Sequence, residues 1–297
     1  MELNWLEDFL ALAEHRNFSR AAEARNVTQP AFSRRIRALE AWVGTPLVLR
    51  SPQGVALNPA GEYLRDQAGS LVRNLQQMRR GALAAAGRGG TALTIAATHA
   101  LSFTFFPGWV RAHAPLETLG TLNLVSDSMA ACERILLAGD ADFLLCHHHP
   151  AAPASFAPQA FASVVVGHDR LVPLSAPDAA GVPRWCLPAR PEAPARLLAY
   201  SAPSGLGRIL EATQRPPQVP GLDAVFTSPL AAALLTMARQ GQGIAWLPAS
   251  LAQEDLAAGH LVEAGAEEFS VPVEIRLFRP RRRQSPVAEA FWQAAAG

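Results

Sequence analysis

The stretch NFSRAAEARNVTQPAFSRRIRALEAWVG, residues 17–44, predicts two short helices that meet across a tight turn. Ser19 is placed to cap the first helix and Thr28 to cap the second, because hydroxyl oxygens accept hydrogen bonds from the free N–H groups at a helix start. Asn26 tolerates the left-handed backbone that the turn between them needs. Pro30 falls in the first turn of the second helix, where a missing N–H costs little. The stretch is therefore typical of a helix-turn-helix.

The second of these helices has an apolar face and a polar face. Its apolar side chains recur at spacings of four, three and four, which predicts one buried stripe. The stripe consists of Phe32, Ile36, Leu39 and Val43. Ser33, Arg34 and Arg37 fall on the opposite side, and Gln29 lies at the exposed N-terminal end. Such a helix fits the major groove of DNA, where Arg and Gln contact guanine and adenine edges. The alternative is a solvated charged face on an ordinary helix.

The composition limits the class of protein. A chain of 297 residues is long enough for two or three domains. Residues 1–90 hold twelve arginines against eight acidic residues, whereas residues 91–297 hold fourteen arginines against seventeen. We therefore expect only residues 1–90 to contact nucleic acid. The three cysteines lack metal-binding spacing and argue against a disulfide framework. The acidic N-terminus and the lack of a membrane-length apolar run predict a cytoplasmic protein without membrane contact.

The segments around the helix-turn-helix complete a small domain. Residues 3–15 read as a further helix, and residues 47–50 and 55–57 as the two strands of a hairpin, or wing. Asn58-Pro59 starts a long helix that runs to about residue 86. Its apolar residues form a heptad seam, which pairs with a second copy of the chain or packs on its own domain. The seam consists of Leu64, Ala68, Leu71, Leu75, Met78 and Ala82. The glycine-rich residues 87–90 predict a hinge.

Beyond this hinge, strand patterns alternate with helix patterns, which predicts βαβ units and a parallel sheet. The predicted strands cover residues 93–97, 122–125, 142–146, 163–167, 170–173, 197–200, 224–227, 243–247 and 271–278. The predicted helices cover residues 101–113, 129–138, 204–213, 229–239 and 286–295. We expect two lobes, of which the second starts near residue 161.

The segment from Asn17 to Arg50 resembles the winged helix-turn-helix of LysR-type transcriptional regulators, and the rest of the chain is similar to that family in length and order. The resemblance rests on residues at fixed spacing: Phe9, Phe18, Ala21, Ala22, Gln29, Pro30, Ala31, Ser33, Arg34, Ile36, Leu39, Glu40, Gly44, Leu47 and Arg50. It implies a homodimer or homotetramer that binds double-stranded promoter DNA and a small-molecule effector, with RNA polymerase as a further candidate partner. It also implies DNA contacts, to bases from Gln29, Pro30, Ser33, Arg34 and Arg37 and to the backbone from Ser19, Thr28 and Arg50.

The fold class that the resemblance implies is α + α/β. It comprises a winged helix-turn-helix domain over residues 1–58, and a long dimerising linker helix and hinge over residues 59–90. A two-lobed, periplasmic-binding-protein-like effector domain follows over residues 91–297. In the family the chain returns to its first lobe, so we expect one lobe from residues 91–160 plus 270–297 and the other from residues 161–269.

Hydroxyl-bearing residues follow four of the predicted strands, at the carboxyl ends where parallel α/β lobes bind ligands. The helix N-termini that begin there favour a small anion such as a carboxylate. Ser and Thr in such places are also ordinary helix caps, and only the repetition at four equivalent places favours a site. The predicted effector-binding residues are Thr98, His99, Ala100, Ser102, Ser126, Ser128, Ser201, Ser204, Thr227 and Ser228.

Oxidant sensing is an alternative way to switch the protein. Met129 and Met237 lie at or near predicted helix starts. Residues 17–40 are also similar in sequence to a branch of the family that responds to hypochlorite. Oxidation would turn an apolar methionine into a polar sulfoxide and disturb a lobe interface. Methionine is, however, also a common core filler.

Metal sites and catalysis find little support in the sequence. A metal site at the run Cys146-His147-His148-His149 is not expected, because consecutive residues rarely converge on one ion. The chain has no GxSxG, HExxH or P-loop motif, so we predict no catalytic residue and no cofactor. A two-lobed solute-binding protein and a two-lobed enzyme remain as alternatives to a regulator.

Overall fold

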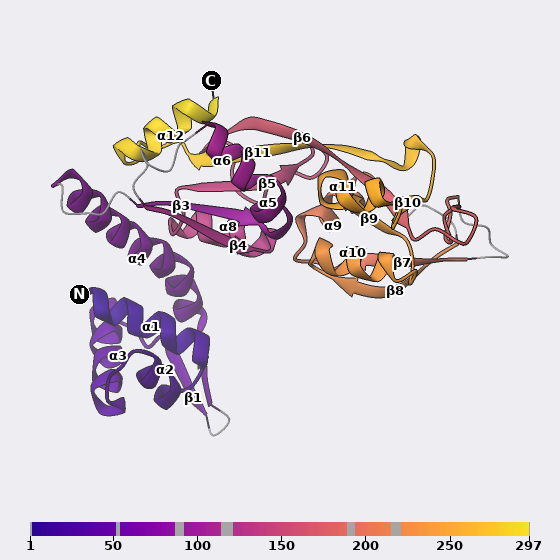
Figure 1. Cartoon of the computed structure of the whole chain (residues 1–297). Helices are drawn as coiled ribbons and strands as arrows, with labels where there is room; N and C mark the ends of the chain where they lie inside the picture. Colours follow the sequence, from indigo (N-terminus) through magenta and orange to yellow (C-terminus); the bar gives the residue numbers. More distant parts are fainter. Residues whose placement is uncertain are drawn as a thin grey trace. The chain divides into compact units, whose positions relative to one another are not determined.

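The computed structural model divides the chain into two compact units, Met1–Ala86 and Gly87–Gly297 (Figure 1). It describes residues 2–51, 54–86, 92–113, 121–188, 194–214 and 221–296. Within these ranges no helix combines the length and the apolar character needed to cross a membrane. The predicted hinge at residues 87–90 lies outside the described residues.

The first unit begins with three helices, α1 (Leu3–His15), α2 (Phe18–Ala24) and α3 (Gln29–Val43). They enclose one core, and its fully buried side chains include Leu6, Phe9, Leu12, Phe32, Ile36 and Leu39. Strands β1 (Val48–Ser51) and β2 (Gly54–Leu57) then pair antiparallel as the predicted hairpin. The apolar stripe of α3 is therefore buried except for its last residue, Val43, which packs at the edge of the core.

The caps of the helix-turn-helix differ from the prediction. Asn17, not Ser19, caps α2, because its side-chain oxygen accepts hydrogen bonds from the backbone N–H groups of Ser19 at 2.9 Å and Arg20 at 3.1 Å. Asparagine is as good a cap as serine, and the helix starts two residues earlier than a cap at Ser19 would place it. Thr28 occupies the cap position of α3 but makes no side-chain capping bond. Asn26 has the predicted left-handed backbone, with φ 53°.

Helix α4 (Pro59–Ala85) is the predicted long helix. Asn58 caps it through a 2.8 Å hydrogen bond from the N–H of Gly61. Its first turns pack on the three-helix core, where Ala68 is buried and Leu64 is partly buried. Further along, three apolar side chains are exposed to 44%, 38% and 69% of their surface, those of Leu71, Leu75 and Met78. The helix therefore packs on its own domain first and presents an uncovered apolar stripe afterwards.

The second unit opens with a parallel βαβ arrangement. Strands β3 (Ala92–Thr98), β4 (Thr121–Asp127) and β5 (Phe143–His148) are parallel, with β3 in the middle. Helices α5 (His99–Thr104) and α6 (Phe106–His113) follow β3, and α8 (Met129–Ala138) follows β4. The expected helix over 101–113 is two helices, since the backbone departs from helix geometry at Phe105 and α6 restarts with Pro107 in its first turn.

Two long antiparallel strands, β6 (Phe161–Ser175) and β11 (Val271–Pro280), connect two hydrophobic cores. Val164 and Val166 of β6 pack against the core around β3 and β5, which we call the first lobe. Leu171 and Leu174 belong to a separate core, which we call the second lobe. The prediction of two strands, over 163–167 and 170–173, was wrong, because the polar residues 168 and 169 continue the strand where it passes from one core to the other.

The second lobe holds the remaining elements. Its strands are β7 (Ala195–Tyr200), β8 (Leu222–Ser228), β9 (Ala245–Pro248) and β10 (Val262–Glu263). Its helices are α9 (Gly205–Ala212), α10 (Ala231–Arg239) and α11 (Ala249–Ala258), followed by the short 3-10 helix η1 (Glu267–Phe269). Helix α12 (Pro286–Ala296) returns to the first-lobe core through Ala288 and Phe291. Helix α11 was not predicted, because its apolar residues do not gather on one side in sequence.

Candidate functional site

The polar face of α3 is the candidate DNA-binding surface. Gln29, Pro30, Arg34 and Arg37 are exposed, and Ser33 is half-buried. Ser19 of α2 and Thr28, which directly precedes α3, are exposed as well. Arg50 lies in β1 opposite Val55, and its side chain is outside the part of the structure that is described.

The arginines of this unit fall into two groups. Arg25 binds Glu7 at 2.6 Å and Asp8 at 2.9 Å, and Arg35 binds the other oxygen of Asp8 at 3.2 Å. Asp8 is fully buried, so these two arginines hold α1 against α2 and α3. By contrast, Arg34 and Arg37 make no ion pair with any described residue. Their cationic groups are therefore available to phosphates or base edges.

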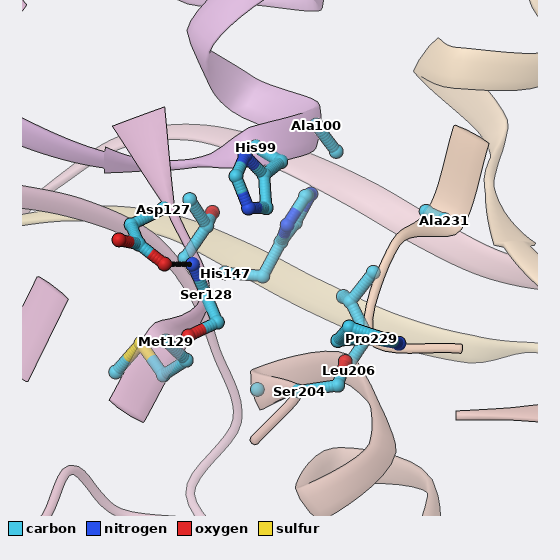
Figure 2. Close-up of a pocket in the computed structure, with 12 residues that line it drawn as sticks. His99, Ala100, Asp127, Ser128, Met129, His147, Ser204, Leu206, Pro229 and Ala231 are labelled. Atoms are coloured by element: carbon cyan, nitrogen blue, oxygen red, sulfur yellow. Dashed lines mark hydrogen bonds between the residues drawn. The ribbon is translucent and has the colours of Figure 1, made fainter. Parts of the chain in front are cut away.

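The second candidate site is a cavity of about 30 Å³ where the two lobes meet (Figure 2). The ends of β3, β4 and β5 and the starts of α5, α8, α9 and α10 contribute to it. It is lined by Thr98, His99, Ala100, Asp127, Ser128, Met129, His147, Ser204, Gly205, Leu206, Pro229 and Ala231. Because a water-sized probe occupies about 10–15 Å³, the cavity holds roughly two waters or one small polar group.

The structure brings five of the ten predicted effector residues to this cavity, namely Thr98, His99, Ala100, Ser128 and Ser204. Ser126 does not line it, but its hydroxyl is 3.1 Å from Nδ1 of His99 and 2.9 Å from the Ser102 hydroxyl, which also lies off the lining. The other three are not in the lining either: Ser201, Thr227 and Ser228. Ser228 instead accepts a hydrogen bond from the N–H of Leu230, just before α10.

The hydroxyl groups in the cavity differ in what they already bind. Ser128 caps α8 and Ser204 caps α9, through bonds of 3.4 Å and 3.3 Å from backbone N–H groups. The Thr98 hydroxyl is buried and has no hydrogen-bond partner among the described residues. A buried hydroxyl without a partner costs free energy, so Thr98 is suited to bind a ligand.

Sequence reasoning missed several lining residues. Asp127, Gly205, Leu206, Pro229 and Ala231 lie at strand ends or helix starts, one to three positions from the predicted residues. His147 was considered only for a metal site, and the described residues contain no group of three metal-binding side chains. Its place just after the predicted strand 142–146 was the signal that could have found it.

Of the two methionines considered for oxidant sensing, one lines the cavity and the other does not. Met129 lines the cavity and is only 5% exposed, and a Cβ placed on Gly205 would lie 2.9 Å from two of its carbons. The start of α9 therefore packs directly on Met129. Met237 packs at the edge of the second-lobe core, away from the cavity lining, and lies near the C-terminal end of α10 rather than at the expected helix start. Burial raises the pKa of the Cys132 thiol to about 12, so this cysteine is a poor nucleophile.

An ion pair joins the lobes beside the cavity. Arg208 of α9 binds the buried carboxylate of Glu133 on α8 at 2.9 Å. Ser155, in the loop after β5, donates to the same carboxylate through its N–H at 2.8 Å and its hydroxyl at 2.9 Å. Since α8 packs on the first-lobe sheet and α9 contributes Leu206 to the second-lobe core, the pair is a latch between the lobes.

Comparison with known proteins identifies the family of both parts of the chain. Residues 3–62 match the bacterial regulatory helix-turn-helix protein family, lysR family, and residues 86–297 match the LysR substrate binding domain. The HTH-type transcriptional regulator YjiE of Escherichia coli (strain K12) is 33% identical, over 99% of this chain and 93% of that protein.

Two solved structures cover the whole chain. Full-length HypT from Salmonella typhimurium, a hypochlorite-specific LysR-type transcriptional regulator, is 34% identical with a TM-score of 0.60, over 100% of this chain and 98% of that one. Vibrio fischeri DarR in complex with DNA is 33% identical with a TM-score of 0.59, over 100% and 99%. The chain is thus matched along its full length, and it belongs to the LysR-type transcriptional regulators, which bind DNA and carry a substrate-binding effector domain.

Proposed function

We propose that α3 enters the major groove and reads promoter sequence. Gln29, Pro30, Ser33, Arg34 and Arg37 contact base edges, because they form the exposed side of a helix whose other side is core. The backbone contacts come from Ser19, Thr28 and Arg50. The observation that carries this proposal is the pair Arg34 and Arg37, whose charges have no protein partner among the described residues.

The protein works on DNA as a homodimer or homotetramer in the cytoplasm. Support comes from the exposed apolar side chains of Leu71, Leu75 and Met78, which a second copy of α4 covers in a coiled-coil contact. Residues 1–58 then form the DNA-binding domain, residues 59–90 the linker, and residues 91–297 the effector domain. Paired domains read a two-fold related site, and RNA polymerase is the partner through which promoter binding acts.

Occupancy of the inter-lobe cavity by a small anionic effector controls this binding. The N-termini of α8 and α9 and the Thr98 hydroxyl favour an anion there. The proposed effector residues are those that line the cavity or contact its lining, with Ser201, Thr227 and Ser228 as further candidates outside the lining. A ligand that binds one arrangement of the lobes better than another shifts the population toward it.

Oxidation of methionine is a second candidate signal, and one observation favours it. Met129 packs between the cavity and the start of α9, so a sulfoxide oxygen there would need a polar partner or push the helices apart. Met237 is the weaker candidate, since it lies off the cavity lining. HypT, whose structure matches this chain, is described as hypochlorite-specific.

The variant Arg34→Ala tests the reading of DNA. The wild-type protein first selects its preferred duplex from a random-sequence pool. Fluorescence anisotropy then measures the affinity of wild type and variant for the selected duplex and for random duplex. Loss of a bidentate base contact costs about 1–3 kcal/mol on the selected duplex and much less on random DNA.

Arg111→Ala is the charge-matched control, because Arg111 is an exposed arginine in α6 of the other unit. It should leave both affinities unchanged. Equal losses on selected and random DNA with Arg34→Ala would make Arg34 a phosphate contact only. Failure of the wild-type protein to enrich any sequence would refute the proposed function.

A further inference from the structure

His147 is a nearly buried imidazole in the wall of the cavity. It is the fifth residue of β5, and 6% of its surface is exposed. Figure 2 shows its ring near that of His99, with Ser128 and Met129 to one side and Leu206 and Pro229 to the other. A polar ring in such a place needs a partner or a ligand.

The partner of His147 is Asp169 of β6. Nε2 of His147 lies 3.4 Å from Oδ2 of this carboxylate, whose side chain is 3% exposed. The same oxygen accepts a 2.5 Å hydrogen bond from the hydroxyl of Ser250, and Oδ1 accepts from the N–H groups of Ser250 at 3.2 Å and Arg170 at 2.7 Å. Ser250 lies in the first turn of α11, where free N–H groups favour an anion.

These contacts keep Asp169 ionised. Burial acts to raise the pKa of its carboxyl group, but the hydrogen bonds from His147 and Ser250 outweigh burial and lower the pKa. An ionised carboxylate only accepts hydrogen bonds, so Nε2 is the ring nitrogen of His147 that donates to Asp169. Nδ1 is therefore the ring nitrogen left for a ligand, and no hydrogen bond to it is found among the described residues.

The charges around His147 define what Nδ1 can bind. Asp169 contacts the far side of the ring, while Asp127 and His99 line the same cavity. The neighbouring strand β11 contributes Glu274, which contacts His148 rather than His147. In the empty protein Asp169 contacts the ring through Nε2, whereas an anion bound at Nδ1 adds a second negative charge that favours a proton on that nitrogen. The free-energy cost of binding an anion here is therefore lowest when the ring takes up one proton at the same time.

We propose that His147 anchors the effector, donating from Nδ1 to the carboxylate of a small organic acid whose binding takes up one proton. This rests on the proposed function, since it names the ligand class of the same cavity. The carboxylate lies between the N-termini of α8 and α9, within reach of the unpartnered Thr98 hydroxyl. The cavity of about 30 Å³ admits the carboxylate group and little more, so the apolar part of the acid faces Leu206 and Pro229.

The test uses the full-length protein without DNA and the sodium salts of formate, acetate and propionate, with acetamide as the uncharged counterpart of acetate. Isothermal titration calorimetry in two buffers of different ionisation enthalpy counts the protons taken up on binding. We expect net proton uptake when acetate binds, an acetate affinity that falls as pH rises, and an acetamide affinity that pH does not change.

His147→Gln keeps a polar side chain of similar length but removes the titrating nitrogen. It should weaken acetate binding by about tenfold to a hundredfold, the worth of a hydrogen bond to a charged group, and abolish proton uptake. His148→Gln is the matched control on the next residue of the strand and should change neither. Nitrogen-15 chemical shifts of the His147 ring should show Nε2 protonated and Nδ1 bare at high pH, and Asp169→Asn should remove this preference.

Acetate binding that is unchanged in His147→Gln, or that takes up no proton, would overturn the assignment of His147. Absence of binding by all three carboxylates would overturn the ligand class. Neither result touches the enrichment of a DNA sequence by the wild-type protein, so failure of this inference is separate from failure of the proposed function. Melting temperatures of the variants identify any that lose binding by unfolding.

Discussion

Removing Glu133 should loosen the contact between the two lobes of the effector domain. Its carboxylate is 5% exposed and accepts three hydrogen bonds, one from Arg208 at 2.9 Å and two from Ser155 at 2.8 Å and 2.9 Å. Glu133→Ala leaves all three donors without an acceptor. Breaking a buried ion pair costs about 3–5 kcal/mol when the remaining charge stays buried.

The local exposure lowers this figure. The Arg208 side chain is 31% exposed and Ser155 lies at the surface, so water can reach both once the carboxylate is gone. We therefore expect Glu133→Ala to reduce the free energy of unfolding by about 2–3 kcal/mol. For a unit of this size, this corresponds to a fall in melting temperature of roughly 4–12 °C.

Urea unfolding of Glu133→Ala, Arg208→Ala and the double variant measures the interaction free energy between Glu133 and Arg208. The double-mutant cycle should give a coupling free energy of about 1–2 kcal/mol. Hydrogen exchange should accelerate at the start of α9 in both single variants, since opening the latch exposes that turn. Glu211→Ala, an exposed acid on the same helix, is the control and should change little. A coupling energy near zero would show that Glu133 and Arg208 stabilise their own lobes independently and do not form a latch.

Three further changes test other contacts. Asp8→Asn should destabilise the DNA-binding unit by about 3–5 kcal/mol, because it removes the buried charge that pairs with Arg25 and Arg35; urea unfolding followed by circular dichroism measures this. Gly61→Ala should also destabilise this unit, since a Cβ there would collide with the carbonyl oxygen of Leu47; a melting temperature equal to that of wild type would contradict the reasoning. Hydrogen bonds from Arg279 and from the backbone of Gln284 lower the pKa of Glu289 to about 2, so its contribution to stability is complete above the pKa of an unfolded glutamate and is lost as pH falls toward 2. Glu289→Gln should therefore show a smaller loss of unfolding free energy between pH 5 and about pH 2 than wild type does.

The parts of the fold that sequence predicted best are those that local contacts determine. The stripe of α3 and the cap at Asn58 depend on residues a few positions apart, and both were found as expected. The cap of α2 was misplaced by two residues, because Asn17 and Ser19 are both competent and only the backbone decides between them.

The candidate effector site was predicted less completely, because its chemistry is not local. The strand ends and hydroxyl clusters gave five residues of the cavity lining, but they gave no reason to choose His147. What distinguishes His147 from His148 is its contact with Asp169, which is 22 positions away and is fixed in turn by Ser250, a further 81 positions on. The sequence prediction left residues 168 and 169 as a break between two strands, yet the structure buries the Asp169 side chain on a continuous strand.

The same reasoning separates neighbouring arginines on α3. Arg34 and Arg35 are adjacent and chemically identical, but Asp8 takes up the charge of Arg35 and leaves that of Arg34 to the solvent. A cation that the fold has already paired gains little from DNA, since it would have to give up its carboxylate. The groups that remain unpaired after folding, such as the Arg34 guanidinium in one unit and the Thr98 hydroxyl in the other, are the ones that gain most from an external partner. Function in this chain is therefore best sought where the core leaves a polar group unsatisfied, and conservative substitutions at such groups should cost binding while sparing stability.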